Sequence, residues 1–478
     1  MDDHELPAGW AAATVDDLGE YINGCAFKPA DWHDNGTPIV RIQNLTDPDK
    51  PLNVTQREVD QKYHIEKRDI LVSWSATLDV FRWGGPLAYV NQHIFKVLPS
   101  EHLDDRFVEF ALKKAISELI NSEHLHGSTM KHINRKPFLA HPINVPPFPE
   151  QQRIVEKIET LFAELDKGEE ALREVQKLLA RYRQSVLKAA VTGTLTADWR
   201  AANGPLKESG EDLLARILKT RRETWQGRGK YKEPVEPDTD GLPVLPEGWT
   251  WTTLEMLGEI STGNTPPTAK KSEYYGGSVP FLKPTDLDQG NAISSCREWL
   301  TDIGSEKSRL VSAGAVMVTS IGATTGKTGV CRFATAAFNQ QINAVSPLPQ
   351  IVSGDLLYFM IIESGFQNRL WSAAAATTLP IINKSKFSRL LVPCPPLNEQ
   401  DELLERIELA MERTEQTEIW CETELKRSAA LRQSVLKDAF SGKLVPQDRS
   451  DEPADKLLDR IRASREEKPK AKPKKPKA

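Results

Sequence analysis

Apolar residues recur at alternating intervals of four and three along residues 150–192, with charged and amide side chains between them. The positions that follow this spacing are Ile154, Ile158, Leu161, Leu165, Gly168, Leu172, Val175, Leu179, Tyr182, Val186 and Ala189. This heptad pattern predicts one long coiled-coil helix with a single apolar seam, about 65 Å long at ~1.5 Å per residue. At Gly168 we expect a kink or a close approach of a neighbouring helix.

The same segment recurs at a constant offset, from residue 399 to residue 444. Both copies begin with Glu-Gln and end with Gln-Ser-Val-Leu-Lys, followed by a shared Gly and Leu. The seam of the second copy, over residues 403–437, is weaker because polar or small residues interrupt it, namely Thr414, Thr417, Cys421 and Ser428. Since neither helix should be stable alone, we expect the two to pack on each other within one chain.

A second repeated motif opens each half of the chain. Residues 6–10 and 245–249 both read Leu-Pro-x-Gly-Trp, so the internal duplication covers nearly the whole sequence. Short runs rich in β-branched residues predict matching strands at residues 38–42, 69–73 and 91–94, and at 280–283, 315–319 and 339–342. Amphipathic segments predict helices at residues 105–122 and 354–373. The fold class we expect is α/β, with two similar mixed α/β domains.

Basic and proline-rich segments follow these domains. Each domain ends in a predicted polar loop without acidic residues, at 127–138 and at 376–387, and a Pro-Pro pair then precedes each long helix. The helix predicted at residues 213–217 is echoed at 457–461. Residues 468–477 contain only Lys, Pro and Ala, so we expect a disordered tail that adds at most weak, nonspecific attraction to DNA.

Composition limits the classes of protein. A length of 478 residues predicts two or more domains, and the net charge of −5 means that any nucleic-acid binding must come from local patches or a partner. The acidic start lacks the apolar region of a signal peptide and the apolar runs are too short to span a bilayer, so the cytoplasm is the expected location. Five cysteines without C-x-x-C spacing indicate neither a disulfide framework nor a zinc site.

In combination, these motifs resemble the DNA specificity subunit of type I restriction-modification systems. The resemblance rests on the two Leu-Pro-x-Gly-Trp motifs, the two Pro-Pro-x-x-Glu-Gln motifs and the two helices ending in Gln-Ser-Val-Leu-Lys-x-Ala-x-x-Gly-x-Leu, over residues 5–445. It implies two target-recognition domains separated by an antiparallel coiled coil, with pseudo-twofold symmetry. Each domain would read one half of an asymmetric, two-part DNA target, and the helices would set the spacer between the half-sites.

The resemblance also implies the partners. They would be double-stranded DNA, two methyltransferase (modification) subunits docked on the helices, and restriction subunits, with no membrane. S-adenosylmethionine would be held by the methyltransferase subunits, and no cofactor is expected on this chain. The expected segments are recognition domain 1 (1–145), long helix 1 (146–196), a short helix and linker (197–244), recognition domain 2 (245–394), long helix 2 (395–445), and a short helix with the tail (446–478).

Three features are weak indications of catalysis or metal binding. Residues 322–328 resemble a P-loop, but they have three residues instead of four before Gly-Lys, and a strand is predicted after them. Residues 145–148 resemble the Asn-Pro-Pro-Tyr/Phe motif of amino-methyltransferases, but Val145 cannot accept a hydrogen bond from a target amino group. The clustered histidines lack ligand spacing; they are His124, His126, His132 and His141.

We therefore expect a non-catalytic, metal-free chain. Two alternatives remain from the sequence: a helical scaffold that joins proteins without reading DNA, and a cryptic methyltransferase or NTPase. Duplex binding that depends on the DNA sequence would favour the DNA specificity subunit over both alternatives.

Comparison of the two halves suggests which residues read DNA. Residues shared by both halves serve the fold or the partner surface, so Asn91-Gln92 and Asn339-Gln340 are predicted to be structural. Polar loop residues that differ between the halves are the base-reading candidates: Gln43, Asn44, Trp74, Ser75, Thr77, Arg82 and Trp83 in the first, and Thr285, Asp286, Ser320, Thr324, Thr325 and Lys327 in the second. For Trp74 and Trp83, the alternative to base reading is that the side chains are buried in the domain. The candidates for phosphate contacts are Lys131, Asn134, Arg135, Lys136, Asn383, Lys384 and Lys386.

Overall fold

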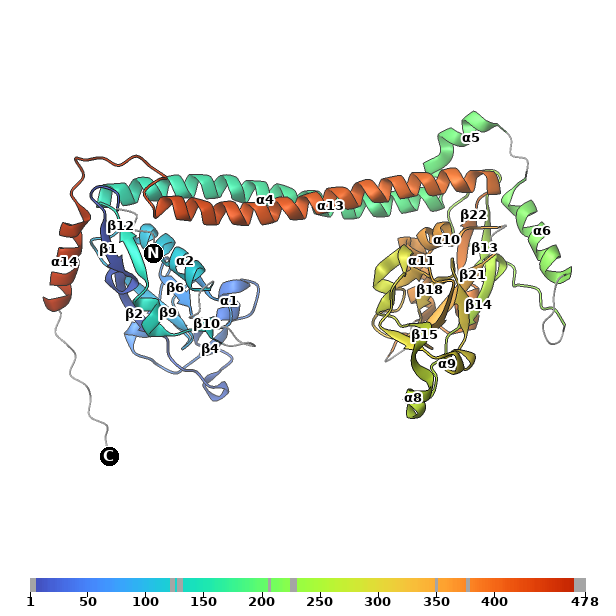
Figure 1. Ribbon diagram of the computed structural model, residues 1–478, viewed down its shortest axis with the longest axis horizontal. Coiled ribbons are helices and arrows are strands. Elements are labelled where there is room, and N and C mark those ends of the chain that lie inside the picture. The colour runs from blue at the N-terminus through green and yellow to red at the C-terminus, as the bar shows by residue number, and fades with distance from the viewer. Residues whose placement is uncertain are drawn as a thin grey trace. The chain divides into compact units, whose positions relative to one another are not determined.

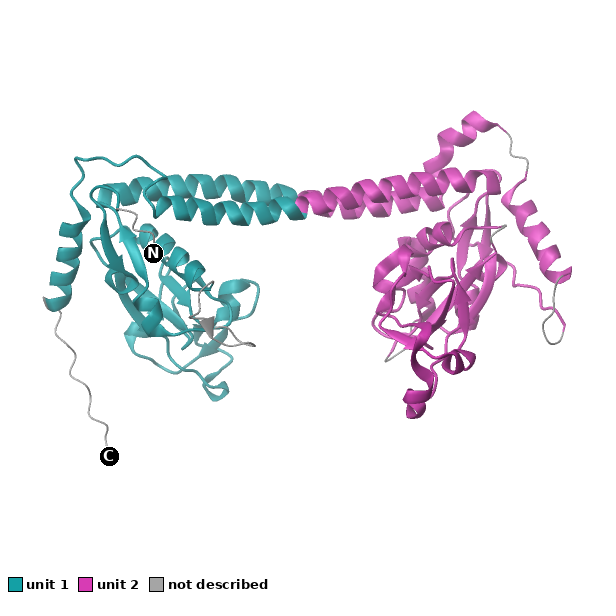
Figure 2. Cartoon of the chain, viewed as in Figure 1, with its two compact units in different colours: residues 1–172, 422–478 teal, residues 173–421 magenta. Residues whose placement is uncertain are grey.

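The computed structural model describes residues 6–120, 125–126, 132–204, 208–223, 230–348, 351–374 and 379–467. The chain divides into two compact units, one formed by residues 1–172 with 422–478 and the other by residues 173–421 (Figure 2). Each unit contains one mixed α/β domain together with part of each long helix (Figure 1). The two similar α/β domains predicted from the repeats are therefore confirmed.

Unit 1 contains two four-stranded sheets and two strand pairs. The first sheet has the order β2 (Gly19–Asn23), β9 (Ile94–Pro99), β6 (Ile70–Ser73), β7 (Asp79–Arg82). The second has the order β4 (Asn53–Thr55), β3 (Thr37–Val40), β8 (Ala88–Val90), β5 (His64–Ile65). The antiparallel pairs are β1 (Ala11–Thr14) with β12 (Pro142–Val145), and β10 (Leu125–His126) with β11 (His132–Ile133). The helices of this domain are α1 (Ile42–Thr46), α2 (Asp105–Ile120) and α3 (Arg135–Leu139).

Unit 2 repeats the two four-stranded sheets and one of the two strand pairs. Its sheets have the orders β14 (Gly258–Thr262), β21 (Ile342–Pro347), β18 (Val316–Thr319), β19 (Thr328–Val330), and β16 (Glu298–Leu300), β15 (Tyr275–Leu282), β20 (Thr335–Phe338), β17 (Leu310–Ser312). The pair equivalent to β1 and β12 is β13 (Thr250–Thr253) with β22 (Leu391–Cys394). Its shorter helices are α5 (Ala197–Asn203), α6 (Gly210–Glu223), α7 (Leu254–Leu257), α8 (Lys271–Tyr274), α9 (Asp302–Glu306), α10 (Gly354–Ile362), α11 (Ser364–Ala374) and α12 (Lys384–Ser388).

The central strands explain why these sequences fold as they do. Every residue of β6 and of β18 is buried, as expected for the unbroken apolar runs Ile-Leu-Val and Val-Met-Val in the middle of a sheet. In both units one strand pair is parallel: β3 with β8, and β15 with β20. Because parallel strands have their carboxyl ends at the same edge of a sheet, the turns that follow them come together.

Three predictions of secondary structure are wrong. The polar loops predicted at 127–138 and 376–387 end in short helices, α3 and α12. Asn91–His93 lies in the turn between β8 and β9, and Asn339–Gln341 in the turn between β20 and β21, so neither segment starts a strand. The helix predicted at 354–373 is two helices, α10 and α11, because Glu363 takes an extended conformation between them. The buried Glu363 carboxylate then accepts the backbone N–H of Phe366 in the first turn of α11.

The long helices are α4 (Phe148–Val191) and α13 (Leu397–Ala439), close to the predicted bounds. Within unit 1, Arg432 of α13 forms ion pairs with Asp166 and Glu169 of α4 at 2.6 and 3.1 Å. Within unit 2, Arg183 of α4 pairs with Glu418 of α13 at 2.9 Å. Arg183 lies later in α4 than Asp166 and Glu169, whereas its partner Glu418 lies earlier in α13 than Arg432. The two helices are therefore paired antiparallel.

The small polar residues of the second helix belong to the helix interface. Thr414, Cys421 and Ser428 are all buried, and Ser428 Oγ donates a hydrogen bond to Glu169 Oε1 at 2.7 Å. The interruptions that weaken the heptad pattern therefore mark close packing. Gly168, in contrast, is exposed, and an added Cβ would meet nothing within 4 Å. The kink or close approach predicted there is wrong, because α4 continues through Gly168 without interruption.

A short helix completes each domain next to the Leu-Pro-x-Gly-Trp motif. In unit 1 this helix is α14 (Ala454–Glu467), and the backbone N–H of Ala454 donates to Gly9 O at 2.8 Å. In unit 2 it is α6, where the backbone N–H of Gly210 donates to Gly248 O at 2.7 Å. The apolar residues that these helices bury are Leu457, Leu458 and Ile461 in α14, and Leu213, Leu214 and Ile217 in α6. The echo between residues 213–217 and 457–461 therefore reflects one structural role.

Among the described residues, no helix is long and apolar enough to cross a membrane. The tail at 468–477 lies outside the described residues.

Candidate nucleic-acid interface

Three turns meet at one edge of the domain in unit 1. β3 and β8 are parallel and end side by side at Val40 and Val90, and the backbone N–H of Asn91 donates to Val40 O at 3.0 Å. The turn after β6 lies beside them, since residues from all three turns line one hollow of about 430 Å³. We call this hollow the edge hollow; its lining is Phe27, Trp32, Arg41, Ile42, Gln43, Thr46, Ala76, Thr77, Asn91, Gln92 and His93.

The same edge exists in unit 2 with different side chains. β15 and β20 are parallel, and the backbone N–H of Asn339 donates to Leu282 O at 3.0 Å. The turn after β18 contains Gly322 with φ +94°, at the position where Ala76 of unit 1 has φ +61°. Lys327 and Asp288 form an ion pair of 2.6 Å that joins this turn to the one after β15. The two domains therefore present equivalent turns that carry different residues.

Four base-reading candidates reach the surface of these turns. Gln43 and Thr77 line the edge hollow of unit 1. Thr285 and Thr324 are exposed in the equivalent turns of unit 2. Base reading by these four residues stays a prediction.

Asn44 and Asp286 are corrected to structural residues. Both are buried, and each uses its side-chain oxygen to accept a backbone N–H three residues earlier, from Arg41 at 3.1 Å and from Lys283 at 2.8 Å. The Asn44 amide also donates to the carbonyl of Lys50 at 3.1 Å. Asn and Asp differ in charge but both stabilise this turn, so the difference between the halves does not indicate base reading here.

Polar side chains buried in the turns form another set of corrections. Ser320 Oγ donates to Val318 O at 3.1 Å and accepts the backbone N–H of Asn343, and Thr325 Oγ1 donates to Gly322 O at 2.7 Å. Ser75 is buried in a bridge with His132. These groups stabilise the turns from inside and are not directed at a ligand. Lys327 is only partly exposed, and its charge is offset by Asp288.

The tryptophan and arginine candidates of unit 1 also have structural partners. Trp83 is buried and donates its indole N–H to Pro86 O at 2.7 Å, while Trp74 stacks on Phe95 at 5.9 Å between ring centroids. Arg82 forms ion pairs of 2.7 Å with both Asp105 and Glu109, which fasten helix α2 to strand β7. The burial alternative for the two tryptophans is therefore the better interpretation, and Arg82 has no free charge to offer to a base.

The basic segments expected to contact phosphate are partly helical. Arg135 and Lys136 lie in α3, and Lys384 and Lys386 lie in α12, all with exposed side chains. Arg135 donates to Tyr21 O at 2.9 Å and lies over the Phe95 ring. Lys386 Nζ donates to Ala373 O at 3.0 Å. Asn134 is exposed before α3, whereas Asn383 accepts the Lys386 backbone N–H as the N-cap of α12; Lys131 lies outside the described residues.

The comparisons with known proteins decide which family these features belong to. The family model for the type I restriction modification DNA specificity domain matches twice, over residues 7–174 and 246–419. The chain belongs to this family. It is 23% identical over 471 residues to the type I restriction enzyme EcoBI specificity subunit of Escherichia coli, covering 95% of this chain and 92% of the relative. It is 24% identical over 507 residues to the StySPI specificity subunit of Salmonella potsdam, covering 97% of each chain.

The fold agrees with that assignment. A solved structure that concerns the complex assembly and conformational transition of the type I R-M system contains a similar chain. That chain superposes on this one with a TM-score of 0.60. The match covers 92% of this chain and 100% of that chain at 16% sequence identity, so it supports the fold alone.

The shared motifs of this specificity-subunit family form a buried hydrogen bond in each unit. Trp10 Nε1 donates to both carboxylate oxygens of Glu150 at 3.1 Å, and Trp249 Nε1 donates to Glu399 Oε2 at 2.8 Å. Thus the Trp of Leu-Pro-x-Gly-Trp is held by the Glu of Pro-Pro-x-x-Glu-Gln. Burial raises the pKa of the Glu150 carboxyl, while Glu399 has Arg200 as an ion-pair partner.

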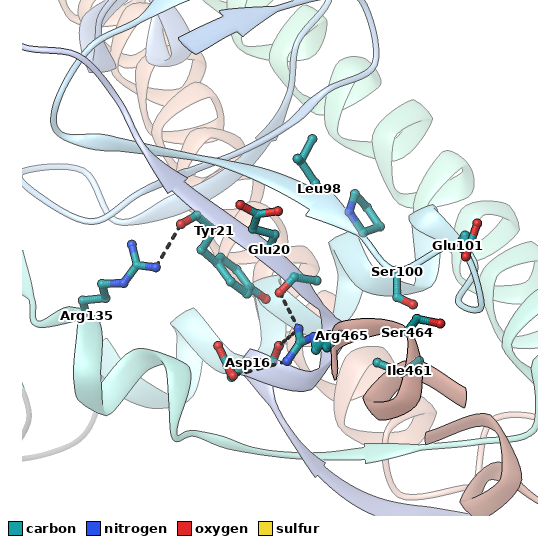
Figure 3. A pocket seen from close by; sticks show the side chains of 12 residues that line it. Asp16, Glu20, Tyr21, Leu98, Ser100, Glu101, Arg135, Ile461, Ser464 and Arg465 are labelled. Carbon is teal, nitrogen blue, oxygen red and sulfur yellow. Dashed lines mark hydrogen bonds and ion pairs between the residues drawn. The ribbon is translucent and has the colours of Figure 1, made fainter. Parts of the chain in front are cut away.

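A second hollow in unit 1, of about 480 Å³, lies between β2 and α14 (Figure 3). Its lining includes the carboxylates of Asp16, Glu20 and Glu101. Arg465 of α14 donates to Gly19 O at 2.7 Å and to Asp16 Oδ2 at 3.3 Å, and so holds the helix on the strand. Arg135 and Arg465 also line the hollow, but three carboxylates against two guanidinium groups leave a net negative charge, so this hollow is a poor surface for a duplex. The contacts of Arg465 in this hollow explain instead how α14 stays attached to β2.

Residues that sequence reasoning did not select complete the edge hollow. Arg41 was placed inside a predicted strand, and Asn91 was predicted to be structural because it is shared by the halves. Only the parallel pairing of β3 with β8 brings these positions together. The available signal was Arg-x-Gln directly after one apolar run, Ile39-Val40, and Asn-Gln-His directly after another, Ala88-Tyr89-Val90.

A first prediction concerns the basic helices α3 and α12. Replacing Lys136 and Lys384 with Ala is expected to weaken binding to all duplexes about equally, because phosphate contacts carry little sequence information. The plot of log affinity against log salt should become shallower by about 1.8, since each phosphate contact contributes ~0.9 to the slope. Lys114→Ala is the control, because Lys114 is already paired with Glu118 at 2.7 Å. Lost sequence preference with an unchanged slope would contradict the prediction.

Proposed function

We propose that the chain is the non-catalytic, DNA-reading subunit of a type I restriction-modification complex, and that each α/β domain reads one half of a two-part target. The observation that carries the proposal is the duplicated edge, where equivalent turns present different side chains. Gln43 and Thr77 occupy these turns in unit 1, and Thr285 and Thr324 occupy them in unit 2. Amide, hydroxyl and cationic groups are the ones that recognise base edges in the major groove.

The contrast between shared and unshared residues supports this proposal. The Trp–Glu hydrogen bond is present in both domains and is buried, so it serves the common fold. The turns that contain Gln43 and Thr77 carry different surface residues in the other domain, as is needed if one scaffold reads two different half-sites, whereas the third turn keeps Asn-Gln in both. The helical-scaffold alternative gives no reason for two equivalent edges with different polar residues.

The direct test is selection of bound duplexes from a randomised pool by the chain assembled with its methyltransferase subunits. We expect two separated blocks of defined sequence, with adenine methylation that requires S-adenosylmethionine and the methyltransferase subunits. The purified chain alone should not methylate DNA. Binding without any sequence preference would refute the proposal, and methylation by the chain alone would support the cryptic methyltransferase instead.

A methyltransferase subunit is the partner we propose for the exposed helix surface of unit 2. Tyr182 of α4 and Trp420 of α13 are 51% and 54% exposed, and the ion pair of Arg183 with Glu418 places them near the same level of the helix pair. Large aromatic side chains in such positions are typical of the residues that dominate binding energy in protein interfaces.

This proposal makes a second prediction. Replacing Tyr182 and Trp420 with Ala is expected to weaken assembly with the methyltransferase by about 30-fold or more, which corresponds to ~2 kcal/mol for a dominant interface residue. The measurement is the dissociation constant of the purified subunits. Trp299→Ala is the matched control, because Trp299 is 38% exposed in the α/β domain of the same unit. Equal losses for the two variants would exclude a specific docking surface.

A third prediction concerns the spacer. α4 and α13 each contribute residues to both units, so we propose that their length sets the spacer. Inserting one heptad between Leu165 and Leu172 and one between Thr414 and Cys421 lengthens both helices by about 10 Å at ~1.5 Å per residue. The preferred spacer should grow by up to about three base pairs, since a base pair rises ~3.4 Å. Selected targets that keep the original spacer would show that the helices do not set it.

A further inference from the structure

The edge hollow of unit 1 has the chemistry of a base-reading site. Its described lining residues supply one guanidinium, three side-chain amides, two hydroxyls and an imidazole, and none of them is a carboxylate. Aromatic rings of Phe27 and Trp32 form another part of the lining. A concave surface with donors and without carboxylates suits the electron-rich edge of a purine.

Arg41 is the cation of this hollow, and its backbone is held by a hydrogen bond. Its backbone N–H donates to Asn44 Oδ1, so the turn that starts at Arg41 is closed by a buried side chain. Its guanidinium carbon lies 5.6 Å from the centroid of the Trp32 ring, and Trp32 is 38% exposed. A guanidinium stacked on an aromatic face keeps its edge N–H groups available for hydrogen bonds in its own plane.

Two related cations show why Arg41 is distinctive. Arg57 lies at the same distance from the neighbouring Phe27 ring, but it forms an ion pair with Asp31 at 3.4 Å and donates to Ala26 O at 3.1 Å. Lys283 occupies the position equivalent to Arg41 in unit 2, and its ammonium group pairs with Glu298 at 2.6 Å. Both charges are therefore offset within the protein. Arg41 instead faces a hollow whose described lining offers it no carboxylate.

We propose that the edge hollow takes the major-groove edge of a guanine in the half-site read by unit 1, with Arg41 donating to O6 and N7. Trp32 supports the guanidinium from one face and sets its plane. The inference rests on the proposed DNA-reading function and names the base that this site recognises. Because Lys283 is neutralised, the equivalent position of unit 2 does not impose the same requirement.

The test uses the chain assembled with its methyltransferase subunits and duplexes based on its selected target. Each base pair of the target is replaced in turn, and affinities are measured for wild type, Arg41→Ala, Arg41→Lys and Arg57→Ala. The wild type should require guanine at one position of one half-site by roughly 5- to 150-fold, the range of a bidentate contact. Arg41→Ala should lose that requirement while every other position keeps its preference.

The other variants separate base reading from charge and folding. Arg41→Lys keeps the positive charge, so it should keep most of the overall affinity but lose most of the guanine preference, because an ammonium lacks the planar fork. Arg57→Ala removes one charge beside the same hollow and should leave the whole pattern unchanged. The proposal is overturned if Arg41→Ala and Arg41→Lys keep the guanine preference, or if Arg41→Ala lowers affinity equally for all duplexes, as a phosphate contact would. A wild type that prefers no sequence would instead refute the proposed function itself.

Discussion

Replacing residues 11–145 with the matching segment of a relative that reads a different target is expected to change one half of the DNA target and leave the other half unchanged. The ends of this segment are partners in one strand pair, because Ala11 of β1 lies opposite Val145 of β12. A graft that begins and ends on paired residues keeps the connection to α4 intact. Two or more mismatches in the original half-site should then lower affinity for it by roughly 30-fold or more, at ~1–3 kcal/mol per mismatch.

The matched exchange in unit 2 covers residues 250–394, where Thr250 lies opposite Cys394. It should change only the other half of the target. Selection of bound duplexes from a randomised pool reads both outcomes. A graft that altered both halves of the target, or neither, would contradict the independence of the two domains.

Glu399→Gln is expected to destabilise unit 2 by about 3 kcal/mol, in the range for breaking a buried ion pair. The Glu399 carboxylate is fully buried and accepts from Trp249, Thr196 and Arg200. A glutamine keeps one acceptor but leaves the Arg200 guanidinium, which is 16% exposed, without its counter-charge. Unfolding of the full chain in urea, monitored by tryptophan fluorescence, measures the change in stability.

Glu150→Gln is the control, because among the described residues the same motif in unit 1 has no ion-pair partner as close as Arg200 is to Glu399. We expect it to cost less than about 1 kcal/mol, since Gln can still accept from the Trp10 indole.

Burial raises the pKa of Glu150, so its protonated form is favoured in the folded state. Its contribution to stability is therefore present below the unfolded pKa of about 4.3 and is lost as the pH rises through the folded pKa. The free energy of unfolding of the Gln variant, minus that of the wild type, should therefore rise between pH 4 and pH 7. Equal losses for both variants at neutral pH would contradict this difference.

Periodicity predicted the long helices because their apolar residues recur at heptad spacing, although Tyr182, predicted to lie on the seam, is 51% exposed. The bounds of α4 and α13 lie close to those expected, and even the polar seam residue Ser428 is buried at the helix interface. Gly168 was misread because a heptad position shows only which face a residue belongs to. It does not show how near the partner helix comes at that level.

The candidate base-reading residues were harder to predict because they lie in turns whose neighbours are set by tertiary structure. Differences between the halves directed attention to the turns, but they could not separate side chains that close a turn from those that face outward. Asn44 and Asp286 differ and yet do the same structural work. Arg41 was missed because the strand predicted at residues 38–42 included it, whereas β3 ends at Val40.

The attachment of α14 to unit 1 has a consequence for how the protein is made on the ribosome. Residues 6–172 are synthesised first, but their apolar cluster is completed by Leu457, Leu458 and Ile461, which are synthesised near the end. Unit 2 is one continuous segment and can fold while translation proceeds. At ~5–20 residues per second, the first domain waits about 15 to 60 s for its last helix. During that interval its exposed apolar surface is the part of the nascent chain on which a chaperone or a protease would act.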